Sequence, residues 1–167
     1  MNFTLRPWRL DDAEGFSRHA NNPKIIANLT NSFPNPFTAE AARAFISSCL
    51  KAGEERQCCR AIVVDGNAVG SIALFLRDDV YCKSATIGYL LGEEFWNQGI
   101  VSQAIRQLCE ECFSRYDLVR ISAEPYATNL GSRRALEKAG FELEGILKKS
   151  VFKNGVILDS CLYALTR

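Results

Sequence analysis

The sequence predicts an α/β fold: a mixed, mostly antiparallel sheet of six to seven strands flanked by about four helices, forming one domain over residues 1–167. Three observations support this prediction. Short apolar runs rich in β-branched residues alternate with amphipathic helical segments. Asp65-Gly66-Asn67 and Lys153-Asn154-Gly155 have the composition of hairpin turns, which join antiparallel neighbours. No repeat, low-complexity tract or change in composition marks a second domain.

The composition is that of an ordinary globular protein, with 47% hydrophobic and 23% charged residues. A net charge of +1 gives no overall attraction to nucleic acid or to an anionic membrane, so any phosphate site must be local. No apolar run approaches the roughly 20 residues of a membrane span, and residues 1–4 do not begin a signal peptide. We therefore expect a cytoplasmic protein with no nucleic-acid or membrane partner.

The seven cysteines do not predict a disulfide framework, because their number is odd and their spacing irregular. Cys58 and Cys59 are adjacent in a strand-like run and should face opposite sides of a sheet. Cys109 and Cys112 lie within a helical segment, not at the helix start where a thiolate would be stabilised. With His19 as the only histidine, we predict no metal site.

The N-terminal third predicts one strand and three helical segments. Residues 2–8 alternate as a strand that Pro7 ends, and a short helix follows from Asp11 or Asp12 to about residue 20. Pro23 can open a further helical piece. Residues 30–37 are polar and broken by prolines, yet contain two aromatic residues, so they could line a cleft. Thr38 caps a strong helical run that Gly53 ends.

The central part predicts three consecutive strands that form a meander. Residues 60–64 and 68–76 flank the Asp65-Gly66-Asn67 turn, and a second turn at residues 77–79 returns the chain into a strand at residues 85–91. A glycine-centred turn then leads into a helix that continues to about residue 116.

The C-terminal part predicts a short strand at residues 119–125 and a helix at residues 129–139, which Gly140 ends. Two long strands follow, at residues 141–151 and 156–165, and they surround the Asn-Gly hairpin signal.

The turn around Gly99 joins the third strand of the meander to an amphipathic helix. Its sequence is Trp96-Asn97-Gln98-Gly99-Ile100-Val101. The first amides of a helix have no partner within the helix and carry the positive end of its dipole. The turn therefore predicts an anion site suited to a phosphate, although an ordinary strand-to-helix loop would read the same way.

A second segment, from Asn129 to Phe141, gives this turn a context. The pattern Asn-x-x-Ser-x-x-x-Leu-Glu-Lys-x-Gly-Phe, together with Ile87-Gly88-Tyr89 and the hairpin over residues 155–163, resembles the GNAT acetyltransferases. Within that family it is most similar to the RimJ/RimL-like branch, which acetylates N-terminal amines of proteins. The element order is similar over nearly the whole chain, and the motifs over residues 87–163.

The resemblance implies the GNAT fold, in which the central strands splay apart and acetyl-CoA lies in the slot between them. The cofactor loop of the family has the motif Gln/Arg-x-x-Gly-x-Gly/Ala. Of the defined positions in this motif, only the central glycine is matched here, by Gly99. Val101 puts a branched side chain where a small residue is usual. Backbone amides do not depend on side-chain identity, so the implied diphosphate site is retained. Its residues are Gln98, Gly99, Ile100, Val101 and Ser102.

The resemblance also implies roles in acyl transfer from a thioester to an amine. The backbone of Tyr89, Leu90 and Leu91 would pair with the pantetheine arm and offer a donor to the oxyanion. Asn129 would hydrogen-bond the cofactor or a water, and Ser132 would protonate or solvate the leaving thiolate. A helix cap and an exposed helix residue are the corresponding structural interpretations of Asn129 and Ser132.

The general base is less clear, because the position that carries a carboxylate in many relatives, just ahead of the Ile-Gly pair, is Thr86 here. Glu93, Glu94, Asp159 and a water relay all remain open, and we include Glu94 in the predicted catalytic set. Asp159 lies among apolar residues and could equally tie the last hairpin together.

The resemblance leaves the acceptor amine open. A free N-terminal amine has a pKa near 8 and is partly neutral without a strong base, whereas a lysine side chain near 10.4 needs more help, so an N-terminal amine is favoured. The alternatives are a polyamine, an aminoglycoside or an amino acid, or a module of the same fold that binds acyl-CoA without catalysis. A homodimer is compatible with the family, and nothing in the sequence tests it.

Overall fold

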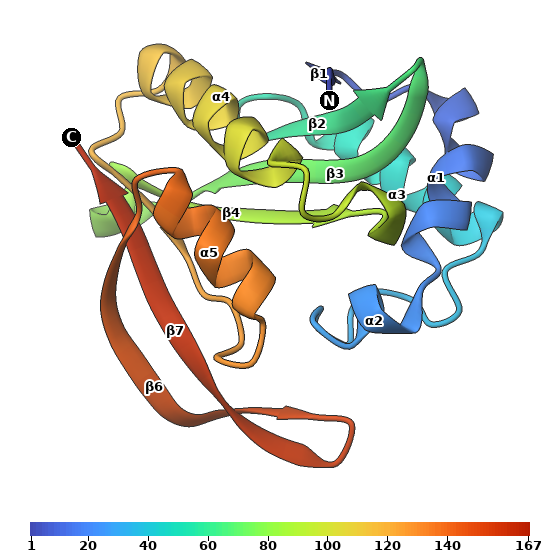
Figure 1. Ribbon diagram of the computed structural model, residues 1–167. Helices are drawn as coiled ribbons and strands as arrows, with labels where there is room; N and C mark the ends of the chain where they lie inside the picture. Colours follow the sequence, from blue (N-terminus) through green and yellow to red (C-terminus); the bar gives the residue numbers. More distant parts are fainter.

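The computed structural model describes residues 1–167 as a seven-stranded mixed sheet with helices on both faces (Figure 1). The strand order is β1-β2-β3-β4-β5-β7-β6, and only β4 and β5 are parallel neighbours. The strands are β1 (Thr4–Arg6), β2 (Gln57–Val64), β3 (Asn67–Leu76), β4 (Ser84–Leu91), β5 (Arg120–Ala123), β6 (Glu142–Lys153) and β7 (Val156–Thr166). The helices are α1 (Ala13–Ala20), α2 (Pro23–Ile26), α3 (Ala39–Ala52), α4 (Ile100–Arg115) and α5 (Leu130–Lys138), with 3-10 turns η1 (Leu10–Asp12), η2 (Asp79–Tyr81) and η3 (Glu93–Phe95).

The predicted architecture and element order are confirmed, and two strands are shorter than predicted. The first covers only Thr4–Arg6, because Pro7 cannot donate to a strand ladder and Trp8 turns into the core, where it is 4% exposed. The strand predicted at residues 119–125 ends at Ala123, two residues before Pro125.

Both predicted hairpin turns have the backbone that their sequences favour. Asp65 and Gly66 have φ angles of 48° and 80°, and Asn154 and Gly155 have 52° and 77°. Two successive positive φ values are the mark of a type I′ turn, whose twist matches that of the flanking strands. The β2–β3 and β6–β7 pairs are antiparallel, as the turns require.

The sheet separates two hydrophobic clusters. The larger contains 23 buried residues and lies between the sheet and helices α4 and α5, and the smaller contains 10 and lies between the sheet and helices α1 and α3. Cys58 belongs to the larger cluster and Cys59 packs against the smaller, which confirms that they face opposite sides of β2. Residues of β4 alternate in the same way, with Ile87 and Leu91 in the larger cluster and Leu90 packed against the smaller.

All seven cysteines are free thiols, and Cys109 and Cys112 are buried on helix α4. No group of three or more His, Cys, Asp or Glu side chains is arranged to hold a metal ion. None of the helices combines the length and the apolarity that crossing a membrane requires.

Candidate active site

A slot opens where β4 and β5 diverge. The two strands pair in register only from Ser84 to Thr86, opposite Arg120 to Ser122. Beyond that point the chain that follows β5 pairs with β7 instead: Cys161 donates its amide to the carbonyl of Pro125 at 2.9 Å, and Tyr126 forms a bridge with Ser160. Residues 87–91 of β4 therefore have a strand partner, β3, on one edge only. The slot is closed at Thr86 and widens toward the end of β4.

The N-terminus of α4 follows the open end of this slot. Gly99 is the N-cap, with φ 76° and ψ 6°, a left-handed conformation that favours glycine. The first backbone bond of the helix runs from the amide of Gln103 to the carbonyl of Gly99. No backbone or side-chain acceptor is within hydrogen-bond distance of the six amides of residues 97–102. A helix N-terminus with free amides is a favourable place for an anion.

Side chains hold this turn in place from outside. The indole of Trp96 donates to the carbonyl of Leu91 at 2.8 Å, and the side-chain amide of Gln98 donates to the carbonyl of Glu94 at 3.0 Å. Val101 packs against the larger hydrophobic cluster. Its branched side chain is thus partly buried against the core.

Ser132 links helix α5 to β4. Its hydroxyl is 2.6 Å from the phenol oxygen of Tyr89 on β4, and its amide donates to Oδ1 of Asn129 at 3.3 Å. Asn129 is therefore the N-cap of α5, as one of its two sequence interpretations predicted. Burial raises the pKa of Tyr89 to about 12, so its phenol stays protonated at neutral pH.

The three carboxylates considered from the sequence are all paired. Oε1 of Glu94, in the turn just beyond β4, lies 2.8 Å from Nδ1 of His19. Glu93 binds Asn22 and Lys24. Asp159 accepts the amide of Lys149 at 2.8 Å and pairs with Lys148, and the bond from that amide holds its pKa below the usual range. Its side chain is 30% exposed, and its contacts are those of a residue that ties β6 to β7, one of the two interpretations from the sequence.

A cavity of about 440 Å³ lies at the closed end of the slot. Thr86 and Ser122, which are register partners on β4 and β5, both line it. Glu124, directly after the last residue of β5, lines it as well. Glu124 makes no ion pair or side-chain hydrogen bond, so a carboxylate faces the same cavity as Thr86 after all.

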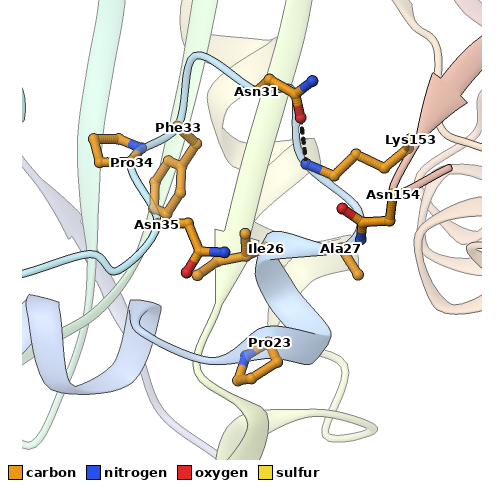
Figure 2. Close-up of a pocket in the computed structure, with 9 residues that line it drawn as sticks. All are labelled: Pro23, Ile26, Ala27, Asn31, Phe33, Pro34, Asn35, Lys153 and Asn154. Atoms are coloured by element: carbon orange, nitrogen blue, oxygen red, sulfur yellow. Dashed lines mark hydrogen bonds between the residues drawn. The ribbon is translucent and has the colours of Figure 1, made fainter.

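A second cavity, of about 330 Å³, lies between α2, the loop after it and the tip of the β6–β7 hairpin (Figure 2). Asn31, Phe33, Pro34 and Asn35 line it, which confirms that the segment over residues 30–37 forms part of a cleft. Lys153 enters from the hairpin side and donates to Oδ1 of Asn31 at 3.0 Å.

The structure places most of the predicted site residues around the slot and adds two groups there, the Tyr89 hydroxyl and Glu124. The free amides follow the end of β4, the edge of that strand is open from residue 87 to 91, and Ser132, beside the helix cap Asn129, contacts Tyr89. Glu94 lies past the end of β4, 2.8 Å from His19. Sequence reasoning missed the Tyr89 hydroxyl and Glu124, and also Lys153 in the second cavity. Strand alternation could have placed Tyr89, but no local signal indicates that Lys153 is buried.

The sequence of the chain is similar to those of known acetyltransferases. A family model described as an acetyltransferase (GNAT) domain matches residues 2–142. The chain is 39% identical over 101 residues to the probable N-acetyltransferase YjcK of Bacillus subtilis, covering 60% of this chain and 56% of that protein. It is 35% identical over 103 residues to the ribosomal-protein-serine acetyltransferase of Escherichia coli, covering 62% and 57%. The matched stretch thus spans little more than half the length of either relative.

Two solved structures are similar over nearly the whole chain. The microcin C7 self-immunity acetyltransferase MccE, in complex with acetyl-CoA and AMP, superposes with a TM-score of 0.84 at 28% identity and covers 99% of this chain and 92% of that one. RimJ of Mycobacterium smegmatis, in complex with CoA-disulfide, gives a TM-score of 0.86 at 27% identity, with 98% and 81% covered.

Proposed function

Because the chain belongs to the GNAT acetyltransferase family, we propose that it transfers the acetyl group of acetyl-CoA to the N-terminal amine of a protein or peptide. Its similarity to the ribosomal-protein-serine acetyltransferase of E. coli supports this choice of acceptor. The observation that carries the proposal is the Ser132–Tyr89 contact of 2.6 Å, because it holds a hydroxyl of α5 against β4, the strand whose end leads into a helix N-terminus with free amides.

Acetyl-CoA is a substrate of this reaction, and the residues present suit it. The amides of residues 97–102 would hold its diphosphate, since backbone N–H groups and the helix dipole both favour negative charge. The unpaired edge of residues 87–91 would hydrogen-bond the pantetheine arm in the manner of an added strand. A backbone N–H on that edge would also stabilise the oxyanion of the tetrahedral intermediate.

The transfer forms a C–N bond and breaks a C–S bond, so one proton must leave the amine and one must reach the sulfur. Ser132 would supply the proton or hydrogen bond to the sulfur. Tyr89 can donate its own O–H to the Ser132 oxygen, which leaves the Ser132 proton free to point into the slot. The raised pKa of Tyr89, about 12, keeps that donor protonated.

We propose Glu124 as the group that accepts the amine proton. It lines the cavity at the closed end of the slot and its carboxylate is unpaired, whereas the carboxylate of Glu94 lies beyond the open end, 2.8 Å from His19. The role first predicted for Glu94 stays a prediction. Measuring kcat against pH for Glu124→Gln and Glu94→Gln decides between them, because only the true base should remove the acid limb of the profile.

The test of the function is a thermal-shift titration with acetyl-CoA, followed by an acceptor screen that measures thiol release with N-terminal peptides, polyamines, aminoglycosides and amino acids. We expect a shift in melting temperature and release with peptides. Ser132→Ala should lower kcat about 10- to 100-fold while the affinity for acetyl-CoA stays within about twofold. No thermal shift would contradict the proposal, and a shift without thiol release from any acceptor would identify a binding module. Light scattering would show whether the chain forms a homodimer.

A further inference from the structure

Lys153 is a buried cation with no anionic partner. Only 7% of the residue is exposed, and its ammonium group donates to one neutral oxygen, Oδ1 of Asn31, at 3.0 Å. No carboxylate lies within 4.0 Å of it, although other lysine and arginine side chains form eleven pairs with carboxylates. An ammonium group can donate three hydrogen bonds, so two of its donors are available to another molecule.

The cavity beside Lys153 has the composition of a site for a small anion. Four polar side chains line it, those of Asn31, Asn35, Lys153 and Asn154, together with apolar groups that include Ile26 and Phe33 (Figure 2). None of its nine lining residues is acidic. Its volume of about 330 Å³ is at the lower end of the usual range for ligand pockets. Its only charge is therefore the positive charge of Lys153.

The burial of this charge is not forced by its place in the fold. Lys153 is the last residue of β6, next to a hairpin tip, and Phe152 and Val156 around it are largely exposed. Lysine side chains at such positions usually extend into solvent. Removing an ammonium group from water without a counter-charge is costly, and one neutral hydrogen bond offsets only part of that cost. Groups kept in such a state inside a cavity are candidates for binding.

The cavity is connected to the reaction slot through one residue. Tyr126 follows β5, and its phenol donates to the carbonyl of Leu29 at 3.0 Å, two residues before Asn31. The carbonyl of Tyr126 in turn accepts the amide of Asn129, the N-cap of α5. The loop that forms the cavity is thus tied to the helix end that bears Ser132. The proposal places the acceptor amine in the slot and a group farther along the acceptor in this cavity.

We propose that the Lys153 cavity binds a carboxylate of the acceptor, so that the enzyme prefers substrates with a negative charge near the amine that is acetylated. One ammonium group balances one carboxylate, and the neighbouring asparagine amides can donate to its oxygens. The same positive charge repels polyamines and aminoglycosides, which are polycations. The carboxylate has two sources: an acidic side chain early in a peptide, or the α-carboxylate of a free amino acid. This inference rests on the proposed function and specifies its substrate class.

The experiment compares acceptors that differ only in that charge. The first set of acceptors consists of peptides with amidated C-termini that have either Glu or Gln at the second, third or fourth position. Free amino acids and their amides are a second, separate set. For the wild-type enzyme we expect kcat/KM about 10- to 100-fold higher with Glu than with Gln at one of these positions, or with free amino acids over their amides. Lys153→Met should remove this preference by raising KM for the Glu peptide. It should leave kcat for the Gln peptide within about twofold of the wild-type value. Lys148→Met, an exposed lysine of the same strand, should keep it.

A second variant keeps the lysine and cancels its charge locally. Asn31→Asp puts a carboxylate where Oδ1 now lies 3.0 Å from the ammonium group, so it should abolish the preference as well. If both variants fold and retain the wild-type ratio, the inference is wrong, and it is also wrong if the wild-type enzyme shows no preference in either arm.

Binding without turnover separates this inference from the proposed function. Acetylated Glu and Gln peptides, which cannot react, are titrated by calorimetry into the enzyme saturated with CoA. Tighter binding of the Glu product that Lys153→Met removes supports the site even if no acceptor is acetylated, in which case only the proposed function fails. Turnover of peptides with equal binding of the two products overturns the inference alone.

Discussion

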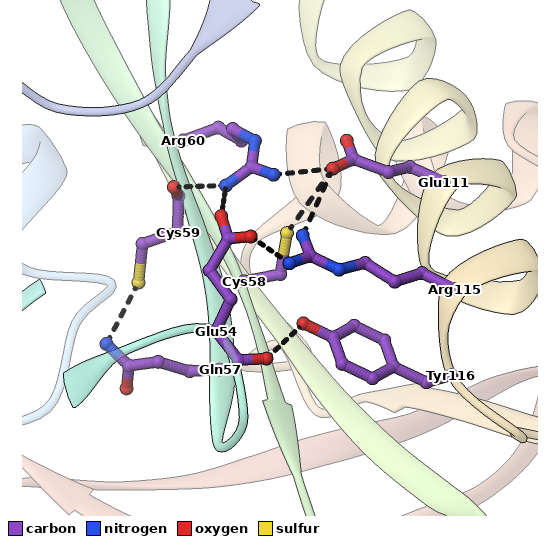
Figure 3. A network of polar contacts seen from close by, with 8 residues as sticks. All are labelled: Glu54, Gln57, Cys58, Cys59, Arg60, Glu111, Arg115 and Tyr116. Atoms are coloured by element: carbon purple, nitrogen blue, oxygen red, sulfur yellow. Dashed lines mark hydrogen bonds and ion pairs between the residues drawn. The ribbon is translucent and has the colours of Figure 1, made fainter. Parts of the chain in front are cut away.

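Two cations are buried in this protein, and their surroundings are opposite. Arg60 on β2 is 8% exposed and lies between two carboxylates, with its guanidinium 2.6 Å from Glu54 and 2.5 Å from Glu111 (Figure 3). Arg115 pairs with Glu54 as well, and the Tyr116 phenol donates to the Glu54 carbonyl at 2.5 Å. Lys153 is buried to the same degree, but its only hydrogen-bond partner is the side-chain amide oxygen of Asn31.

The difference separates a structural charge from a binding charge. The Arg60 network joins β2, the loop before it and helix α4, and every charge in it has an opposite charge beside it (Figure 3). It therefore requires no ligand to be complete. The Lys153 cavity contains the cation alone, so a carboxylate from outside completes it. Burial of a charge thus says little about its role until its partners are counted.

The same substitution at the two cations should have opposite effects on stability, and the larger effect is at Arg60. Arg60→Met leaves Glu54 and Glu111 beside an apolar group. Removing one partner of a buried pair typically costs about 3–5 kcal/mol, and we expect about 2–3 kcal/mol here, because both carboxylates reach solvent and Glu54 keeps Arg115. Chemical denaturation would measure this loss.

The matched control is Arg56→Met. Arg56 pairs with Asp78 at 3.1 Å, but both side chains are more than 70% exposed, so the change should stay within about 0.5 kcal/mol. A loss at Arg60 no larger than this control would show that the network contributes nothing measurable to folding.

Lys153→Met should leave the free energy of unfolding unchanged or raise it by about 1 kcal/mol. The substitution removes a desolvated charge and keeps a flexible side chain of similar length, and the lost partner is only a neutral amide that can turn to water. The measurement is the same denaturation series. A loss comparable to that of Arg60→Met would mean that Lys153 is buried for structural reasons, and the contrast between the two cations would disappear.

Much of the fold and part of the site follow from local sequence. The turn at Gly99 could be predicted because a helix start leaves its first amides free whatever the side chains are, and Asn129 and Ser132 because a cap and its neighbour are fixed by helix geometry. Tyr89 could be placed on the face of Ile87 and Leu91 by alternation alone. These features depend on residues a few positions apart.

The remaining features depend on contacts between distant segments. The Asn-Gly turn after Lys153 predicts a solvent-exposed tip. The loop at Asn31, which is 122 residues away in the sequence, encloses the lysine. His19 likewise had no orienting neighbour in sequence, and its partner Glu94 comes from the turn after β4. The hydrophobic periodicity of the sequence does not predict such contacts, because they depend on where the folded sheet places its loops.

The smallest expected effect concerns acid. Hydrogen bonds from Arg115, and then from Arg60, hold the pKa of Glu54 below its ordinary value of 4.5, although partial burial opposes this. A carboxyl whose pKa is lowered by folding stabilises the native state above its unfolded pKa, and this contribution is lost as the pH falls from about 4.5 through the folded pKa. Between pH 7 and pH 3, the melting temperature of Glu54→Gln should therefore fall less than that of the wild-type protein.

Lys153→Met is the comparison for this titration, because no carboxylate lines the Lys153 cavity. Its melting temperature should fall with pH in parallel with that of the wild-type protein, since the other carboxyls with lowered pKa values, such as Asp12 and Glu144, are common to both. A Lys153→Met curve that flattens as Glu54→Gln does would reveal an acidic partner of Lys153. The cavity would then be balanced from within, as the Arg60 network is, and would have no charge left to offer an acceptor.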